Sequence, residues 1–396
     1  MTDSAAARPL QGLTLLSGVT VVDFTQALSG PYCTMMLADL GADVVKVESP
    51  HRGDDARHWG PPFVGNDAAY FVSVNRNKRS IALDLKNADD LAVCLDMVAT
   101  ADVVVENWRP GTAARLGLGP EQLRAKYPQL VYVSISGFGQ DQPDRSGYDQ
   151  ILQGTSGVMC LTGPPNEPTK WGVPIGDIAA GMFAATAVTS ALYERRATGV
   201  GRTIDVAIQD CLVSMLTHYA ARYFRTGVTP LSDYNGHATI APYGLFRVRD
   251  GFINVCVGND SQFVRMCTAL DLSSLADDRR FATNAGRVAH KADLLAVLNP
   301  VLAALDASDA IDSLEQVGVP VGPVRDIGEV LEDPATYDRN MVVTFERDDS
   351  GAARVVNSPW KFDNVAAAIR LPPPHLGQHG SEVRDHARRG TDPVGL

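Results

Sequence analysis

Short runs of β-branched residues alternate with helical segments through the first half of the chain, and this alternation restricts the fold more than any other feature of the sequence. The runs are apolar along their whole length, which is typical of strands covered by helices on both faces. We therefore expect an α/β fold with a Rossmann-like large domain around a parallel sheet. The expected strands are residues 18–24, 43–48, 80–85, 102–107 and 130–136, and the expected helices between them include residues 31–40, 88–101 and 120–127.

The turn after the first expected strand reads DFTQALSGP and lacks the GxGxxG pattern of a dinucleotide-binding loop. A nicotinamide-dependent dehydrogenase is therefore not favoured. The turn instead places Ser29 and Gly30 before Pro31, which suits an N-cap followed by the first helical position. Backbone N–H groups at such a helix start can face a ligand, and an ordinary capped helix explains the segment equally well.

Turn-forming residues divide the chain into a large domain and a smaller one. Residues 226–243 are dense in Gly, Pro, Asn and Asp, which is typical of a linker. The next segment, FRVRDGFINVCVG, predicts a hairpin with its turn at Asp250 and Gly251. We therefore expect three parts: residues 1–225 begin the large domain, residues 226–325 form the linker and a small α+β domain, and residues 326–396 return to complete the large domain.

The charge and the cysteines exclude several classes of function. The chain carries 35 Lys and Arg against 46 Asp and Glu, a net charge of −11, so neither nucleic acid nor an anionic membrane surface is an expected partner. The six cysteines form no CxxC pair and no Cys/His spacing suited to zinc, so we expect no metal site. The longest uncharged run, residues 178–193, is shorter than the ~20 residues that cross a bilayer. Without a secretory signal at the N-terminus, we expect a cytoplasmic protein.

Asp177 stands in VPIGDIAAGMF, directly before this uncharged run. A carboxylate at a helix start accepts hydrogen bonds from free N–H groups, and the helix dipole stabilises its charge. Most aspartates in this position are caps and nothing more. The alternative is a nucleophilic carboxylate, flanked by Gly176 and small alanines that leave room for a substrate. These residues alone favour the cap.

Two stretches with basic side chains are candidates for contact with an anionic ligand: NRNKRSIALDLK at residues 75–86 and ENWRPGTAARLG at residues 106–117. The second follows an expected strand, so Asn107, Trp108 and Arg115 are expected at the carboxyl edge of the sheet, where open α/β sheets bind ligands. An aromatic ring, an amide and several cations suit a ligand with a purine ring and phosphates. A merely solvated Arg115 on a helix surface is the alternative interpretation.

Several longer motifs follow one another along nearly the whole chain. The first is ALSGPYCTMMLADLGADVVKVESPHRGDDAR, followed by NRNKRSIALDLK, DVVVENWRPGTAARLGLG, SISGFGQ, SGYDQILQ and VPIGDIAAG. The later ones are ERRATGVGRTIDVAIQD, DRRFATNAGRVAH, GVPVGPVRDIGEVLEDP, SPWKF and PPPHLGQH. In this order and spacing, the motifs resemble the class III CoA-transferase family, which includes formyl-CoA transferases, carnitine CoA-transferases and α-methylacyl-CoA racemases.

The resemblance implies an acyl-CoA substrate, a carboxylic acid acceptor, no tightly bound cofactor, and an interlocked homodimer in which each chain threads through the other. It implies Asp177 as the catalytic residue, because the family's catalytic aspartate falls in the segment matching IGDIAAG. Tyr148 and Asp149 match the pair that approaches the reacting acyl group. Ser49 departs from the family, which often has Arg at this position. The positions that match CoA-contacting residues are Ala27, Leu83, Lys86, Asn107, Trp108 and Arg115.

The chemistry that the resemblance implies is transfer of CoA through an aspartyl anhydride and an aspartyl thioester at Asp177. The family's racemases instead use a His-Asp pair to move an α-proton, at the positions of Tyr148 and Asp149 in this chain. A phenol with a pKa near 10 is a poor base at neutral pH, so a transferase is favoured. A 2-methylacyl-CoA racemase and a non-catalytic acyl-CoA-binding protein are the alternatives.

Overall fold

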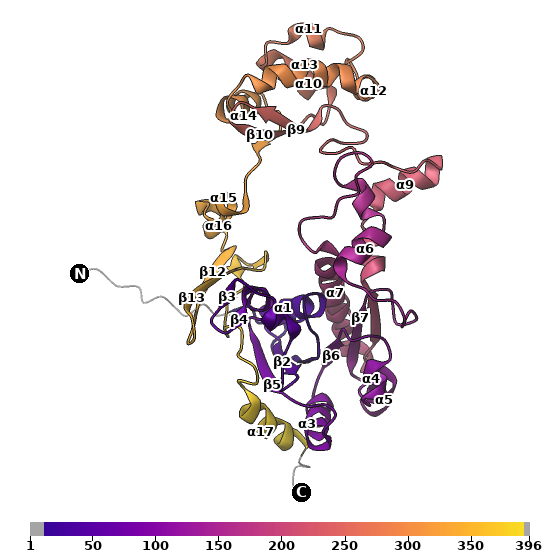
Figure 1. The fold of residues 1–396 in the computed structure, drawn as a ribbon, viewed down its shortest axis with the longest axis vertical. Helices are drawn as coiled ribbons and strands as arrows, with labels where there is room; N and C mark the ends of the chain where they lie inside the picture. The colour runs from indigo at the N-terminus through magenta and orange to yellow at the C-terminus, as the bar shows by residue number, and fades with distance from the viewer. Residues whose placement is uncertain (1–11, 392–396) are drawn as a thin grey trace, which may run out of the picture. The chain divides into compact units, whose positions relative to one another are not determined.

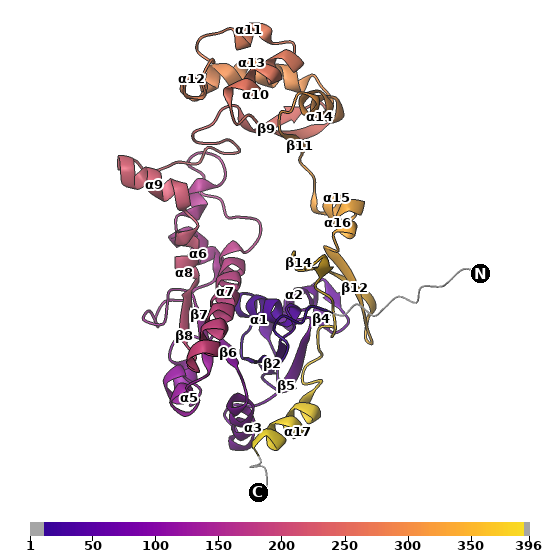
Figure 2. The same cartoon turned by 180° about the vertical axis from the view of Figure 1, so that it is seen from behind.

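The computed structural model describes residues 12–391, which form two compact units (Figures 1 and 2). Unit 1 contains the residues up to Val158, Trp171–Ala221 and the residues from Pro334 onward. Unit 2 contains Met159–Lys170 and Arg222–Asp333. The expected division differs from this at residues 159–170 and 222–225, which we expected in the large domain, and at the return, which we expected from residue 326 and which begins at Pro334.

Unit 1 is built on a six-stranded parallel sheet with strand order β5-β2-β1-β6-β7-β8. Val22 of β1 lies opposite Val45 of β2 and Val104 of β6. The predicted parallel α/β sheet is therefore confirmed, with β5 starting two residues earlier than expected. The strands are β1 (Thr20–Asp23), β2 (Asp43–Glu48), β5 (Lys78–Ala82), β6 (Val103–Glu106), β7 (Val131–Ser136) and β8 (Thr203–Ala207).

Helices cover both faces of this sheet, which is why its strands are apolar at consecutive positions. On one face, α1 (Ser29–Asp39) and α7 (Ile175–Thr198) lie side by side over Val21 and Val103 (Figure 1). On the other face, Val22 and Val104 share a core with α3, α5 and α17. The bounds of these and the neighbouring helices are α3 (Ala88–Ala99), α4 (Thr112–Arg115), α5 (Pro120–Lys126), α6 (Asp149–Thr155), α8 (Ile208–Ser214) and α17 (Gly380–Thr391).

The segment between β2 and β5 and the return from Pro334 complete unit 1. The hairpin of β12 and β13 is antiparallel, and α17 packs against α3 and β5. The elements are η1 (Asp55–His58), β3 (Phe63–Val64), β4 (Asp67–Ala68), α2 (Ala69–Ser73), α16 (Pro334–Asp338), β12 (Val342–Arg347), β13 (Gly351–Val356), β14 (Lys361–Phe362) and β15 (Val365–Ala366).

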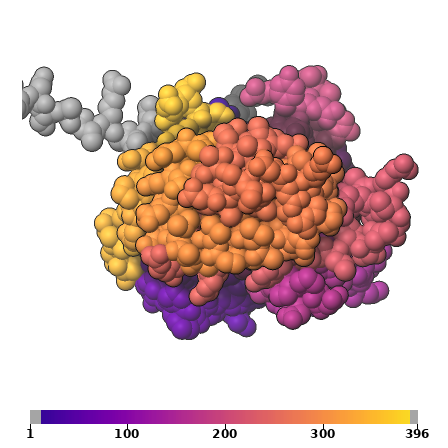
Figure 3. Space-filling model, turned by 90° about the horizontal axis from the view of Figure 1, so that it is seen from above, coloured from indigo at the N-terminus to yellow at the C-terminus, as the bar shows by residue number. Residues whose placement is uncertain are grey.

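Unit 2 has its own core, around a three-stranded antiparallel sheet of order β11-β10-β9. Figure 3 shows the surface of this unit, mostly in orange. The predicted hairpin is present, because β9 (Tyr243–Val248) and β10 (Gly251–Cys256) are joined by a turn at Asp250. The hydroxyl of Ser232 donates to the carbonyl of Gly163 at 2.5 Å, which ties residues 159–170 to this unit. Two further elements, η2 (Val158–Leu161) and α9 (Thr217–Thr226), begin in unit 1 and end in unit 2. The remaining elements of unit 2 are α10 (Asp260–Ala269), α11 (Ser273–Ala276), α12 (Asn284–Ala289), α13 (Lys291–Ala303), α14 (Ala307–Gln316), β11 (Val321–Pro323) and α15 (Ile327–Leu331).

The uncharged run lies in α7, which is long and apolar enough to pass a length-and-hydropathy test for a membrane span. Half of the most apolar 18-residue stretch of this helix is buried inside the protein. Core helices of soluble proteins pass the same test. The side that is rich in Gly and Ala packs against α1, β7 and β8, so the helix that we expected to be buried is buried on this side, while Met182, Phe183 and Tyr193 are exposed.

Candidate active site

Asp177 lies in the first turn of α7, at the place where α7 approaches the start of α1. The close approach depends on Gly181. A Cβ atom at this position would lie 2.7 Å from the carbonyl oxygen of Ser29 and 3.0 Å from the ring of Tyr32. The hydroxyl of Ser29 faces the Asp177 carboxylate and lowers the pKa of that group. The small residue in α7 therefore brings a hydroxyl and a carboxylate together at the carboxyl edge of the sheet.

Neither Ser29 nor Asp177 is the helix cap that the sequence suggested. Helix α1 begins at Ser29 itself, and its N-cap, Leu28, makes no side-chain hydrogen bond to the first turn. Helix α7 begins two residues before Asp177, and no side chain of its own N-cap closes it. Both polar side chains are thus available to each other.

The environment of Asp177 makes its carboxyl group far more basic than usual. Its pKa is raised to about 7: burial is the largest cause, the negative charge of Asp149 acts in the same direction, and the hydroxyl of Ser29 opposes both. A carboxylate with such a pKa is a better nucleophile than an ordinary one and is still substantially ionised at neutral pH.

Asp149 supplies the cap of α7 from a neighbouring helix. Its Oδ1 accepts hydrogen bonds from the backbone N–H groups of Gly176, at 2.8 Å, and Asp177, at 3.3 Å. Its Oδ2 accepts from the side-chain amide of Gln153 at 2.6 Å. Tyr148, the other member of the predicted pair, is 70% exposed. Asp149 therefore lies beside the candidate nucleophile, with both carboxylate oxygens occupied by protein groups.

Sequence reasoning missed Tyr70, which also lies near Asp177. Burial raises the pKa of Tyr70 to about 12, and the charges of Asp177 and Asp149 act in the same direction. The ring of Trp59 stands edge-on to the Tyr70 ring, with centroids 5.1 Å apart. Both residues belong to the segment between β2 and β5, where short elements and turns leave no periodicity to read. The two aromatic side chains were the feature of this segment that could have indicated a functional site there.

A cavity of about 420 Å³ lies in unit 1 at the carboxyl edge of the sheet. Leu83, Lys86 and Trp108, three of the predicted contact positions, line it. The Trp108 ring lies 5.1 Å from the ring of Phe24, which gives the cavity an aromatic wall. Ser49, the departure from the family pattern, also lines the cavity. The arrangement of an aromatic wall and a lysine suits a purine nucleotide with phosphates.

The other three predicted contact positions do not line this cavity. Asn107 uses its side-chain amide on the backbone of Gln26: Oδ1 accepts from the N–H at 2.9 Å, and Nδ2 donates to the carbonyl at 2.8 Å. Ala27 has a φ of 63° and donates its N–H to Asp54. Arg115 is exposed and donates to the Thr112 hydroxyl at 2.9 Å. Asn107 and Ala27 thus shape the turn around Gln26, which does line the cavity.

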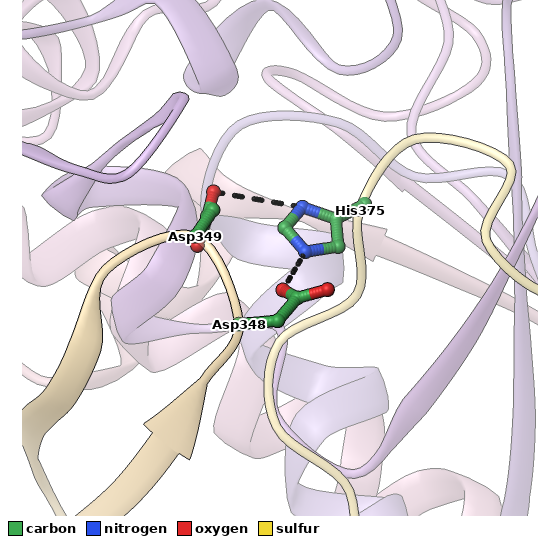
Figure 4. Close-up of side chains that lie close together, drawn as sticks. All are labelled: Asp348, Asp349 and His375. Atoms are coloured by element: carbon green, nitrogen blue, oxygen red, sulfur yellow. Dashed lines mark hydrogen bonds and ion pairs between the residues drawn. The ribbon is translucent and has the colours of Figure 1, made fainter.

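Asp348, Asp349 and His375 form the cluster of the described residues that most resembles a metal site (Figure 4). Protein groups already occupy its ligand atoms. The Nδ1 atom of His375 lies 2.8 Å from the guanidinium of Arg347, and Nε2 lies 2.6 Å from the carboxylate of Asp348. Asp349 accepts from the N–H of Asn66 at 3.1 Å. The positive charge of the adjacent guanidinium disfavours binding of a metal cation at this cluster. We infer that the cluster instead holds the β12–β13 turn against the loop that precedes α17.

Comparison with known proteins decides which family this site belongs to. The model of CoA-transferase family III matches residues 16–380. The chain belongs to CoA-transferase family III. It is 40% identical over 377 residues to the succinate–glutarate CoA-transferase of Agrobacterium fabrum, with 93% of this chain and 94% of the relative covered.

Two further comparisons agree with the family. Identity to the human succinyl-CoA:glutarate CoA-transferase is 37% over 380 residues, covering 95% of this chain and 87% of the relative. A crystal structure of a CAIB/BAIF family protein from Brucella suis superimposes with a TM-score of 0.85 at 39% identity, covering 95% of this chain and all of that one. The predicted CoA-transferase is thereby confirmed. CoA thioesters and carboxylates are its substrates.

Asp149→Asn in this CoA-transferase is expected to move the pH dependence of kcat to lower pH, by about one pH unit, because it removes the like charge beside Asp177. Asparagine keeps an oxygen that can accept the N–H groups of Gly176 and Asp177. In the wild type, kcat should rise with pH through about 7 as Asp177 loses its proton. The measurement is kcat against pH for both proteins. An unchanged midpoint, or a shift to higher pH, would show that Asp149 does not set the pKa of Asp177.

Proposed function

We propose that Asp177 carries CoA from an acyl-CoA donor to a carboxylate acceptor. Its carboxylate oxygen attacks the thioester carbonyl carbon, the C–S bond breaks, and CoA leaves as thiolate with an aspartyl anhydride left behind. The thiolate then attacks the aspartyl carbonyl carbon, which forms an aspartyl thioester and releases the donor acid. The acceptor carboxylate attacks the carbonyl carbon of this thioester, which breaks the C–S bond, expels CoA thiolate and forms a second anhydride. The thiolate finally attacks the acceptor acyl carbon, which gives the new CoA ester and frees the Asp177 carboxylate.

The observation that carries this proposal is the partly buried Asp177 carboxylate, beside the Ser29 hydroxyl and with a pKa of about 7. The acyl links conserve the energy of the thioester only if water is kept from them, and a partly buried nucleophile limits the access of water. The donor N–H groups required by the negative intermediates are available at the start of α1, which carries no side-chain cap.

The placement of Tyr148 and Asp149 favours a transferase over a racemase. A racemase needs two free groups on opposite faces of the α-carbon. Both oxygens of Asp149 are hydrogen-bonded within the protein, and Tyr148 is mostly exposed. A group that acts on the carbonyl carbon, as Asp177 does in this proposal, leaves the α-proton in place.

We propose the 420 Å³ cavity as the binding site for the nucleotide part of CoA, with Trp108 and Lys86 as its contacts. Arg115 adjoins the cavity through Thr112, which lines it. No tightly bound cofactor is needed for this chemistry. For the acyl groups we propose small dicarboxylates, because the relatives at 40% and 37% identity are named for succinate, succinyl-CoA and glutarate.

The proposed substrates are tested by mixing the protein with succinyl-CoA and carbon-13-labelled glutarate in deuterium oxide and identifying the CoA esters by mass spectrometry. We expect labelled glutaryl-CoA without deuterium at the α-carbon. Transfer to other acids but not to glutarate would overturn the proposed acceptor, and rapid α-deuteration without CoA transfer would overturn the proposed reaction.

An interlocked homodimer is the proposed assembly, and its support is apolar surface that the single chain leaves uncovered. In α7, Tyr193 is 79% exposed. Helix α9 has no buried residue, and its Phe224 is 81% exposed. We also propose a cytoplasmic location, in agreement with six cysteines that are all free thiols.

Dilution of the purified protein to nanomolar concentration is expected to leave the dimer intact, because threaded chains must partly unfold before they separate. Mass photometry at this concentration measures the masses directly. A population of folded monomers that grows on dilution would contradict an interlocked dimer.

A further inference from the structure

Lys46 and Asp54 form a fully buried ion pair that the chemistry above does not use. Their Nζ and Oδ2 atoms are 2.8 Å apart, and both side chains are 0% exposed. Desolvating two charges is costly, and a well-packed apolar pair of similar volume is often as stable. Packing alone therefore does not explain why a charged pair is buried at this position.

The pair holds the two residues on either side of Gln26. Nζ of Lys46 donates to the carbonyl of Thr25 at 2.6 Å. Oδ1 of Asp54 accepts from the N–H of Ala27 at 2.9 Å. Ala27 has a φ of 63°, in the left-handed region that is unfavourable for a residue with a Cβ atom. The ion pair thus secures a turn that its own residues would not adopt unaided.

This turn joins the two halves of the site. Gln26 lines the proposed CoA cavity, and the side-chain amide of Asn107 makes hydrogen bonds to both its backbone N–H and its carbonyl. Two residues after Ala27, Ser29 begins α1, and its backbone lies against Gly181 of α7, the helix that carries Asp177. A shift of the turn would therefore change both the cavity wall and the position of Ser29 relative to the candidate nucleophile.

We propose that Lys46 and Asp54 are positioning residues, which hold the Thr25–Ala27 turn so that CoA and the Ser29–Asp177 pair meet in the geometry for transfer. The proposal rests on the function proposed above. Neither residue touches substrate or reacting atoms; both act through the backbone of the turn.

Asp54 also caps a helix, and an experiment on the turn must separate this role from the hydrogen bond to Ala27. Its Oδ1 also accepts from the N–H of Ala56, so it is the N-cap of the short helix η1. Its own N–H donates to Glu48 at 3.0 Å. Loss of the side chain therefore lowers stability whether or not the turn matters.

The matched comparison is Asp54→Ala against Asp54→Asn. Both leave Lys46 without its anionic partner, but only asparagine keeps an oxygen for the N–H groups of Ala27 and Ala56. We expect Asp54→Ala to raise the Kd for CoA, measured by calorimetry, about tenfold or more, and Asp54→Asn to recover most of this loss. Lys46→Met, which leaves the cap of η1 in place, should also raise the Kd.

The control is Asp39→Ala at the other end of α1. It breaks an equally buried pair, in which Asp39 and Arg76 are 2.6 Å apart, far from the turn in the chain. We expect it to lower Tm without changing the Kd for CoA. If Asp54→Ala and Lys46→Met lower Tm but bind CoA as the wild type does, the pair is only structural and the proposal is wrong.

A pH profile supplies a readout that a loss of stability alone would not move. Ser29 lowers the pKa of Asp177, so a displaced turn should shift the midpoint of kcat in Asp54→Ala to higher pH. The other groups near Asp177, which are Asp149 and Tyr70, are unchanged in this variant. An unshifted midpoint would contradict the proposal. Wild-type protein that binds CoA without transferring it would refute the proposed function, and the Kd comparison would still test the turn.

Discussion

Asp177→Asn should lose CoA transfer by at least about a thousandfold and should melt at a higher temperature than the wild type. The amide cannot form the anhydride or the thioester, so no covalent route remains. It is close to the carboxylate in shape and keeps an oxygen for the hydroxyl of Ser29.

The expected gain in stability follows from the direction of the pKa change. The folded protein raises the pKa of Asp177 from 3.8 to about 7, so folding favours the protonated form. Below the pKa of the unfolded state, Asp177 does not reduce the free energy of unfolding. As pH rises from this pKa to the folded pKa of about 7, the free energy of unfolding falls, and it stays reduced at higher pH. The two pKa values differ by roughly three, so ionised Asp177 lowers the free energy of unfolding by at most about 4 kcal/mol. The neutral amide of asparagine avoids this loss.

Differential scanning calorimetry and a transfer assay on the same preparation test both outcomes. Asp210→Asn is the matched control, because Asp210 is an exposed carboxylate in the first turn of α8. It should change neither quantity greatly. A less stable Asp177→Asn would show that the carboxylate serves the helix start, and transfer near the wild-type rate would remove Asp177 from the mechanism.

Gly181→Ala is expected to lower both Tm and kcat, although alanine favours a helix over glycine by about 1 kcal/mol. The new Cβ would lie 2.7 Å from the carbonyl oxygen of Ser29, so α1 and α7 must move apart. Overpacking of this kind costs about 1–3 kcal/mol. A displacement approaching 1 Å between Ser29 and Asp177 would lower kcat by up to about a hundredfold.

The control for Gly181 is Gly380→Ala at the start of α17, where an added Cβ meets nothing within 4 Å. This variant should be as stable as the wild type or slightly more so. Urea denaturation and kcat measurements on the two variants make the comparison. A Gly181→Ala protein that gains stability and keeps its activity would show that the close approach of the helices does not position Asp177.

The parallel sheet was predictable because burial on both faces leaves a direct trace in the sequence. Val21 and Val22 face opposite cores, so both must be apolar, and the run of β-branched residues reports this at once. The motif around Asp177 was predictable through the family resemblance. Leu83, Lys86 and Trp108 were expected to contact CoA, and all three line the cavity.

Contacts between distant segments were not predictable from local patterns. Ser29 and Asp177 each looked like the cap of its own helix, and the cap of α7 comes instead from Asp149, which lies 28 positions earlier than Asp177. Asn107 was predicted to contact CoA, and nothing in the sequence indicated that its side-chain amide also pairs with Gln26, 81 positions away. A polar side chain can form a hydrogen bond with a residue that is distant in the sequence instead of with a local backbone group. The residues next to that side chain do not indicate which distant residue it is.

Mass spectrometry of the peptide that contains Asp177 tests the central claim most directly. The protein is incubated with succinyl-CoA without an acceptor, quenched in acid and digested. We predict that this peptide gains the mass of CoA less one water, that hydroxylamine removes the adduct, and that Asp177→Asn forms none. An adduct on a different residue, or rapid CoA transfer with no adduct on Asp177 at any time, would contradict the account.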